Sequence, residues 1–305
     1  SRGLGDVYKR QLIINENMMM HRNFYQNIYA YDNKEYDRNY PFAAKEYDKS
    51  NMGLVMKQGS SGLMYQLNSH PKEYEYGFNG PWGEVKKYSV TESGTLNYKG
   101  SYPEKSLTTK ITKQPVTDFE KSILIEYYDA NENLIAREQH ISMQDRRITY
   151  YIYDDLGHLR YVLPPSANIQ ATTSPDQLPE DCFYYEYDEY NHICKQYIPG
   201  ASYTLFLYDK RGRLVMKQNG EQRKNRQWTF TKYDIFDRPI MEGIYSGGTY
   251  ETHKAALANQ TNFGEEIDRA AYNYTNQCYP NIDNANILNI TYYDDYAVSY
   301  THLRA

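Results

Sequence analysis

The phrase YDEYNHI occupies residues 187–193, YDKRGRL occupies residues 208–214, and YDIFDRPI occupies residues 233–240. An aromatic run precedes each phrase and an apolar run follows it. Two strand-forming runs joined by a short polar turn are typical of a β-hairpin. The stretch 183–245 therefore predicts one hairpin written three times in succession.

The chemistry of the phrase fits a particular turn. Asp directly after Tyr suits the first corner of a type I turn, because its carboxylate can accept backbone N–H groups ahead of it. Three residues later, a type I hairpin with a bulge needs a residue that tolerates positive φ. The residues at that position enter the left-handed region easily; they are Gly157, Asn191, Gly212 and Asp237. Two places further on, an apolar residue begins the return strand; these residues are Leu134, Leu159, Ile193 and Leu214.

Two copies depart from this pattern. Glu132 holds the position that needs positive φ in the copy at Tyr128, and Pro239 replaces the apolar residue in the copy at Tyr233. Glu carries a steric penalty at positive φ, and Pro lacks a backbone N–H for the ladder. We expect these two hairpins to be looser than the others.

The clear copies recur along the chain. Their first tyrosines are separated by steps of 25, 34, 21 and 25 residues, by subtraction of 128, 153, 187, 208 and 233. Recurrence of this kind indicates a repeat architecture, in which each hairpin buries its faces against its neighbours. The residues predicted to define the repeat are structural, namely Tyr128, Asp129, Tyr153, Asp154, Gly157, Tyr187, Asp188, Tyr208, Asp209, Gly212, Tyr233 and Asp234.

We therefore predict an all-β fold of consecutive antiparallel hairpins that form a curled sheet, with one short helical insertion. The insertion is expected at residues 251–260, with Thr249 or Thr252 as the cap. The predicted organisation is a polar lead-in (12–41), degenerate β repeats (42–122), core repeats (123–245), and the helical insertion with a final β repeat (246–297). The proline-bearing stretch 163–179 is expected to be a surface loop.

Composition limits the classes of function. The 305 residues include 36 Tyr, and the mean hydropathy is −0.86. A chain so rich in aromatic residues is not typical of disorder, and a core built on Tyr is expected. A net charge of −5 argues against a general binder of nucleic acid or of an anionic membrane. The basic cluster 223–226 is expected to be a solvated loop tip, and no apolar run approaches the ~18 residues of a membrane helix.

Cysteines and chain ends add little chemistry. The three cysteines, Cys182, Cys194 and Cys278, have no metal-site spacing and are expected to be small buried hydrophobes. A cross-strand bridge between Cys182 and Cys194 is the alternative. Residues 1–11 and 298–305 resemble translated sequencing-adaptor read-through, so both segments are expected to be non-native and the natural protein to continue in both directions.

With these phrases, the chain resembles RHS-repeat (YD-repeat) proteins of the bacterial surface-associated or toxin-related kind. The strongest matches are residues 208–214, 232–239 and 153–157. The sequence YTN at 274–276 ahead of Pro280, followed by YYD at 292–294, also resembles a junction in one branch of these proteins. The resemblance covers about residues 40–296.

The resemblance implies a β-ribbon that spirals into a hollow shell, as in the RHS parts of insecticidal toxin complexes, contact-dependent toxins and teneurins. In the delivery systems the shell encloses a variable C-terminal toxin, and members that release it carry an aspartyl self-cleavage motif with a DPxG-type signature. No such signature occurs in this sequence. The chain is therefore expected to form part of the wall of such a shell and not the toxin that the shell encloses.

A search for catalytic and metal-binding motifs finds no phosphate-binding loop, nucleophile elbow, zinc spacing or EF-hand. The carboxylate pairs Asp154–Asp155 and Asp294–Asp295 suit glycoside hydrolysis in principle, but they stand at turn positions where Asp has a structural reason to be. We expect no enzyme activity, no cofactor and no metal.

The expected function is thus a structural segment of an RHS shell on a secreted or surface-anchored bacterial protein. Its expected partner is a C-terminal effector domain of the same full-length polypeptide, and neither nucleic acid nor membrane insertion is expected. The alternative is a stand-alone recognition module that binds glycans or surface proteins through Tyr-rich faces, because Tyr is enriched at recognition surfaces. A glycosidase with a carboxylate pair is a third hypothesis.

Overall fold

The computed structural model describes residues 43–80, 85–115, 121–140, 145–268, 274–282 and 285–293. The lead-in 12–41 and the two segments expected to be non-native, 1–11 and 298–305, lie outside the described residues. The carboxylate pair Asp294–Asp295 lies outside them as well.

The described chain is almost entirely antiparallel β-structure, which confirms the predicted fold class. It divides into two compact units, Ser1–Tyr88 with Tyr98–Tyr151, and Ser89–Asn97 with Ile152–Ala305. In both units most strands pair with the strand before and the strand after them in sequence, as repeated hairpins require.

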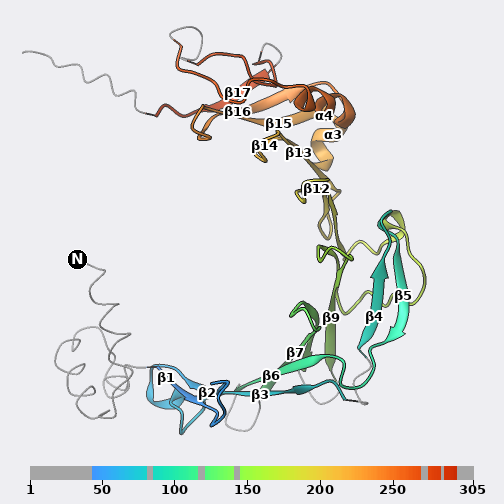
Figure 1. Cartoon of the computed structure of the whole chain (residues 1–305), viewed down its shortest axis with the longest axis vertical. Helices are drawn as coiled ribbons and strands as arrows, with labels where there is room; N and C mark the ends of the chain where they lie inside the picture. Colours follow the sequence, from blue (N-terminus) through green and yellow to red (C-terminus); the bar gives the residue numbers. More distant parts are fainter. Residues whose placement is uncertain are drawn as a thin grey trace, which may run out of the picture. The chain divides into compact units, whose positions relative to one another are not determined.

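In the first unit the strands are hydrogen-bonded in the order β1-β2-β3-β6-β7-β8-β9 (Figure 1). Their bounds are β1 Ala44–Tyr47, β2 Val55–Gly59, β3 Lys72–Phe78, β6 Thr108–Pro115, β7 Lys121–Tyr128, β8 Leu134–His140 and β9 Arg146–Tyr153, with a 3₁₀ turn at Leu63–Tyr65. The first unit thus contains most of the region expected to hold degenerate repeats, and residues 89–97 belong to the second unit.

One excursion interrupts the hairpin succession. Strands β4 (Lys86–Val90) and β5 (Leu96–Ser101) form a separate two-stranded sheet, and β3 pairs directly with β6. Tyr88 of β4 packs edge-on against Tyr150 of β9, with ring centroids 5.7 Å apart, so β4 packs on the sheet face. The buried Asn79 closes the excursion, since its side chain donates to Pro103 O (2.7 Å) and accepts from Leu107 N (2.7 Å).

In the second unit the order is β10-β11-β12-β13-β14-β15-β16-β17, without a skip. The bounds are β10 Leu159–Leu163, β11 Phe183–Tyr187, β12 Ile193–Tyr197, β13 Thr204–Tyr208, β14 Leu214–Gln218, β15 Gln227–Tyr233, β16 Pro239–Ser246 and β17 Ala285–Ile290. A register shift occurs at Tyr187, Tyr208 and Tyr233, where the strand enters its turn, as expected for a bulged hairpin.

The two hairpins expected to be looser have the same turn conformation as the other copies. Glu132 adopts φ +63° and Asp237 adopts φ +64°, so both turns have the left-handed residue that the other copies have. These hairpins also have long ladders, running from Ile123↔His140 to Tyr128↔Leu134 and from Gln227↔Ser246 to Tyr233↔Pro239. The unfavourable Glu132 and Pro239 therefore leave the turn conformation and the strand pairing of these hairpins intact, and their looser packing stays a prediction.

The predicted helical insertion is confirmed as α4, Tyr250–Ala258, with Thr249 as its N-cap. A second helix, α3 (Gly220–Lys224), was not expected; it includes half of the basic cluster 223–226, which is therefore not a simple loop tip. A capping box explains it, because Asn219 Oδ1 accepts from Gln222 N (2.9 Å) and Gln222 Oε1 accepts from Asn219 N (3.0 Å). No helix in the described part of the chain has the length and apolar character to cross a membrane.

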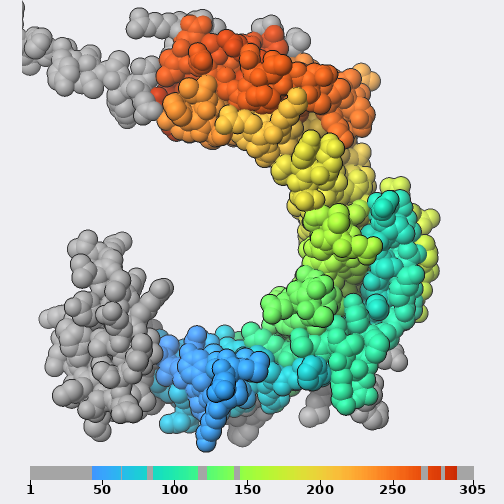
Figure 2. Space-filling model, in the orientation of Figure 1, coloured from blue at the N-terminus to red at the C-terminus, as the bar shows by residue number. Residues whose placement is uncertain are grey.

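A large apolar cluster lies in the second unit. It is formed by buried side chains of β13 to β16 together with α4 and the segment 274–282; its members are Leu207, Val215, Met216, Trp228, Phe230, Ile240, Met241, Leu257 and Tyr274. In the space-filling view these elements, coloured from gold to red-orange, form a continuous body (Figure 2). Burying side chains of this size contributes about 2 kcal/mol each, so this cluster is the main anchor of the C-terminal repeats.

Candidate functional site

Each repeat turn is built around its aspartate. In all five phrases one carboxylate oxygen accepts the backbone N–H groups of the second and fourth residues that follow. Asp209 Oδ1, for example, accepts from Arg211 N (2.9 Å) and Arg213 N (3.1 Å). The same pair of bonds is made by Asp129, Asp154, Asp188 and Asp234. These bonds hold the turn that the bulged hairpin needs.

The second carboxylate oxygen holds the side chain four residues later. Asp209 Oδ2 accepts from Arg213 Nε (2.8 Å), and Asp234 Oδ2 accepts from Arg238 Nε (2.6 Å). In other copies the partner is Asn133, His158 or His192. Burial alone would raise the pKa of Asp234, but the N–H groups and the guanidinium of Arg238 hold that pKa below its usual range. The turn aspartate is therefore a fixed anion.

A tyrosine joins each repeat to the one before it. The hydroxyl of the phrase tyrosine donates to the carbonyl of the first residue in the preceding return strand. These pairs are Tyr187 to Leu159 (3.0 Å), Tyr208 to Ile193 (3.0 Å), Tyr233 to Leu214 (2.8 Å) and Tyr293 to Pro239 (3.2 Å). Tyr293 thus occupies the place of a further phrase tyrosine, which agrees with the YYD sequence at 292–294.

The same tyrosine ring also receives the side chain that the preceding aspartate holds. His158 stacks on Tyr187 and His192 stacks on Tyr208, both with ring centroids 4.7 Å apart. The guanidinium of Arg213 lies 4.6 Å from the Tyr233 centroid, and that of Arg238 lies 4.4 Å from the Tyr293 centroid. We call this hydrogen bond and stack together the repeat contact; the structure contains four in succession.

These contacts bear on the carboxylate pair considered for glycoside hydrolysis. Both oxygens of Asp154 are used within its turn and toward His158 and Arg160, whereas Asp155 is exposed beside it. An acid and a nucleophile in this chemistry must face one substrate across several ångströms. Asp154 instead points into its own turn.

A buried ion pair joins β15 to the segment that follows α4, and it was not evident from the sequence. Lys232 Nζ donates to Glu265 Oε1 (2.7 Å), Asn276 Oδ1 (2.7 Å) and Cys278 O (2.8 Å), and both charged side chains are fully buried. Glu265 also accepts from Thr275 Oγ1 and from the N–H groups of Gln277 and Cys278. Because each charge is met by several hydrogen bonds, this cluster fastens Glu265 and the stretch 275–278 to β15.

Tyrosines of β10, β11 and β12 and Tyr203, which directly precedes β13, form a row across the sheet. Ring centroids are 4.7 Å apart for Tyr161 and Tyr184, 6.0 Å for Tyr184 and Tyr197, and 5.3 Å for Tyr197 and Tyr203. Tyr161 and Tyr184 are buried, as expected of a core built on Tyr. The row therefore serves mostly as packing and becomes partly accessible only at Tyr197 and Tyr203.

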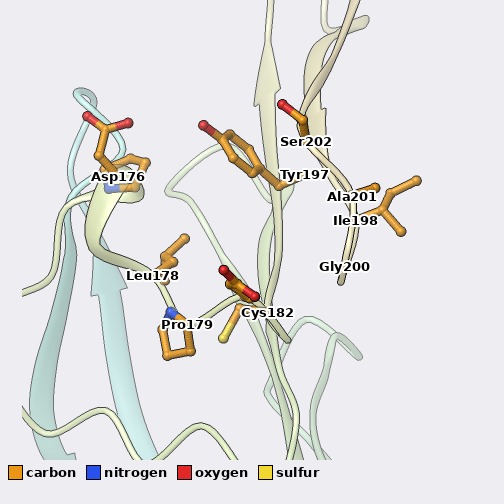
Figure 3. Close-up of a pocket in the computed structure, with 11 residues that line it drawn as sticks. Asp176, Leu178, Pro179, Cys182, Tyr197, Ile198, Gly200, Ala201 and Ser202 are labelled. Carbon is orange, nitrogen blue, oxygen red and sulfur yellow. The ribbon is translucent and has the colours of Figure 1, made fainter. Parts of the chain in front are cut away.

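A cavity of about 410 Å³ lies at the accessible end of this row (Figure 3). One wall is the proline-bearing loop with its 3₁₀ turn at Pro175–Gln177, and the other is the end of β12 with the turn that follows it. Gly200 N donates to Glu180 O (3.2 Å) and joins the two walls. The stretch 163–179 is thus more than a surface loop; Ala167 and Ile169 are buried.

The cysteine thiols are not activated as nucleophiles. All three are free, and burial raises the pKa of Cys182, beside the cavity, to about 12 with a contribution from Asp181. The thiol is therefore protonated at neutral pH and a poor nucleophile. Among the described residues, no group of three or more His, Cys, Asp or Glu side chains is arranged to hold a metal ion.

No family model and no curated protein matches the sequence. Solved structures similar to this chain include the crystal structures of TcdB2-TccC3-TEV (14% identity, 75% of this chain and 12% of that chain, TM-score 0.37), of TcdB2-TccC3 without the hypervariable C-terminal region (17%, 68% and 10%, 0.38) and of TcdB2-TccC3 (16%, 68% and 11%, 0.39). This chain spans 10–12% of the length of those chains.

Proposed function

We propose that this chain is a non-catalytic structural segment of an RHS-repeat wall, on a secreted or surface-exposed bacterial protein, that encloses or displays a C-terminal effector of the same polypeptide. The observation that carries the proposal is the repeat contact. Its four copies in succession commit the phrase tyrosines and aspartates to joining hairpins, as expected for a wall that extends by repetition.

The use of the phrase residues also supports a structural role. The aspartate carboxylates are engaged within their turns, and the tyrosine hydroxyls are engaged with the preceding repeat. The buried Lys232–Glu265 pair is fully hydrogen-bonded and inaccessible to substrate. The surface location and the effector follow from the family resemblance alone and are part of the proposal.

The test begins with the gene beyond the codon for Tyr296. Further Tyr-Asp phrases followed by an unrelated domain would support the carrier wall, and that domain would identify the activity. A stop or an anchoring segment soon after residue 296 would contradict the enclosing role and favour the recognition module instead.

A second experiment tests enclosure directly. The full-length protein would be digested with a nonspecific protease, and the half-life of the downstream domain compared with that of the same domain expressed alone. Enclosure predicts a much longer half-life within the full-length protein. Equal half-lives would overturn the enclosing role while leaving the repeat architecture intact.

A further inference from the structure

We propose that the cavity between Pro175–Gln177 and the end of β12 binds an alkylammonium group, the chemistry of a lysine side chain or of a free primary amine. The cavity volume of about 410 Å³ falls within the range of small-molecule sites. This inference does not depend on the wall function proposed above.

The charge at the cavity favours a cation. Asp176 and Glu180 line it, whereas none of its lining residues in the described chain is Lys, Arg or His. Neither carboxylate forms an ion pair with a described residue. This contrasts with the neighbouring acid Glu186, which pairs with Lys195 at 3.2 Å. The cavity lining therefore carries two carboxylates that form no ion pair with a described residue.

An aromatic ring supplies the second recognition element. Figure 3 shows Tyr197 and Asp176 on facing walls of the cavity. Burial raises the pKa of Tyr197; Lys195 opposes this rise and Asp176 adds to it, so the Asp176 charge is felt at this ring. An ammonium group between the ring and the carboxylate would gain from both, since cations are attracted to aromatic faces and to carboxylates.

Neighbouring contacts show that rings in this row receive cations. Lys195 Nζ lies 5.6 Å from the Tyr197 centroid and 5.0 Å from the Tyr203 centroid. The guanidinium of Arg223 lies 3.5 Å from the Tyr203 centroid. Rings at the accessible end of this row therefore take part in cation–π contacts within the chain.

The remaining lining suits an aliphatic stem. Pro175, Leu178, Pro179 and Ile198 contribute apolar surface to the lining of the cavity. Long cationic side chains bury their methylene groups along apolar surface while their charged head meets a polar partner. An alkylammonium ion, with a charged head and an aliphatic stem, matches this combination of carboxylates and apolar surface better than an anion or a compact inorganic cation does.

The experiment uses ligand-observed NMR titration of the full chain with n-butylammonium, with n-pentanol as a neutral analogue, and with methyl glucoside as a neutral sugar. We expect saturable binding of butylammonium that weakens as ionic strength rises. In the double variant Asp176→Asn/Glu180→Gln the affinity should fall at least about tenfold, which corresponds to 1.4 kcal/mol. Both side chains are exposed, so these isosteric changes should leave the melting temperature unchanged.

The matched control is Asp155→Asn/Glu189→Gln, which removes two negative charges at exposed turn positions outside the cavity lining. It should leave the affinity unchanged. A capped lysine peptide distinguishes the sources: tighter binding than butylammonium assigns the site to a polypeptide side chain, and equal binding assigns it to a free amine. Binding of pentanol or methyl glucoside as strong as that of butylammonium, or an unchanged affinity in the cavity variant, would overturn the proposal.

Discussion

The guanidinium of Arg213 lies 4.6 Å from the ring centroid of Tyr233, and it does so while paired with Asp209 in its own turn. The turn aspartate of one hairpin thereby positions the guanidinium against which the tyrosine of the next hairpin packs. The Tyr233 hydroxyl completes the contact by donating to the carbonyl of Leu214, the first residue of the return strand β14 that follows the Asp209 turn. The same side chains thus stabilise the turn of one hairpin and attach the next hairpin to it.

Removing a phrase hydroxyl should weaken one junction. For Tyr233→Phe we expect the free energy of unfolding to fall by about 1 kcal/mol, because Leu214 O loses a hydrogen bond while the ring stays in place. Urea unfolding followed by circular dichroism measures the change. Tyr190→Phe is the control, since Tyr190 is 69% exposed at a turn; equal effects in the two variants would contradict the role of the hydroxyl.

Removing a turn aspartate should cost more. Asp209→Ala leaves two backbone N–H groups of the turn and the Arg213 guanidinium without their acceptor, so we expect a loss of about 3 kcal/mol. Asp209→Asn should cost less, since it keeps an acceptor oxygen. Thermal unfolding of both variants, with the exposed Asp155→Ala as control, measures the order. A loss no greater than that of the control would show that the turn forms without the carboxylate.

The buried ion pair should behave as a coupled unit. Lys232→Met leaves Glu265 buried without its cation, and we expect a loss of about 3–5 kcal/mol. Adding Glu265→Gln removes the stranded charge and should recover part of that loss. A double-mutant cycle by urea unfolding gives the coupling energy. Additive effects of the two changes would contradict the coupling.

His253 should make the second unit sensitive to mild acid. Gly247 O can only accept, so His253 Nε2 carries the proton and Nδ1 accepts from Tyr279 Oη, 2.5 Å away. Burial lowers the pKa of His253 below 6.5, although the Gly247 bond opposes this shift. The unfolded chain then binds more protons below pH 6.5, so stability present above that pH is lost as the pH falls toward the folded pKa.

The expected loss is about 1 kcal/mol per pH unit at its steepest. Denaturation midpoints measured between about pH 7 and pH 5, above the range in which carboxylates titrate, test it. The variant His253→Gln should be less stable at pH 7 but should lose most of the pH dependence in this window. A slope equal to that of the natural sequence would assign the pH dependence to other groups.

The edge of the second unit should promote self-association. Among the described strands β17 pairs only with β16, and its Leu288 is 65% exposed. An accessible strand edge with apolar side chains is a site for pairing with another chain. We expect the chain to self-associate and Leu288→Lys to reduce this, as measured by light scattering at several concentrations. A monodisperse monomer without the substitution would contradict the prediction.

The local features were predictable because they depend on residues close in sequence. The turn aspartates, the positive φ of Gly157 and Asn191, and the cap at Thr249 all act over four residues or fewer. The capping residues of α3, Asn219 and Gln222, were also present in the sequence, but the basic residues beside them suggested a loop.

Features that depend on long-range contacts were not predictable. The Lys232–Glu265 pair joins residues 33 positions apart, and nothing near either residue marks the partner. The pairing of β3 with β6 requires Asn79 to join both ends of a long excursion, and the cavity forms only where the proline-bearing loop meets β12. A single sequence gives no signal for such pairings.

The repeat contact between Tyr293 and Pro239 spans an interval of sequence that includes α4 and Glu265, the buried partner of Lys232 in β15, yet its geometry matches that of adjacent hairpins. The junction depends on the exposed surface of the preceding hairpin and not on the number of residues in between. New sequence can therefore be inserted between two hairpins during evolution without a change in how they join. Such modularity would let this type of chain gain binding loops or helices while the contacts between its hairpins stay the same.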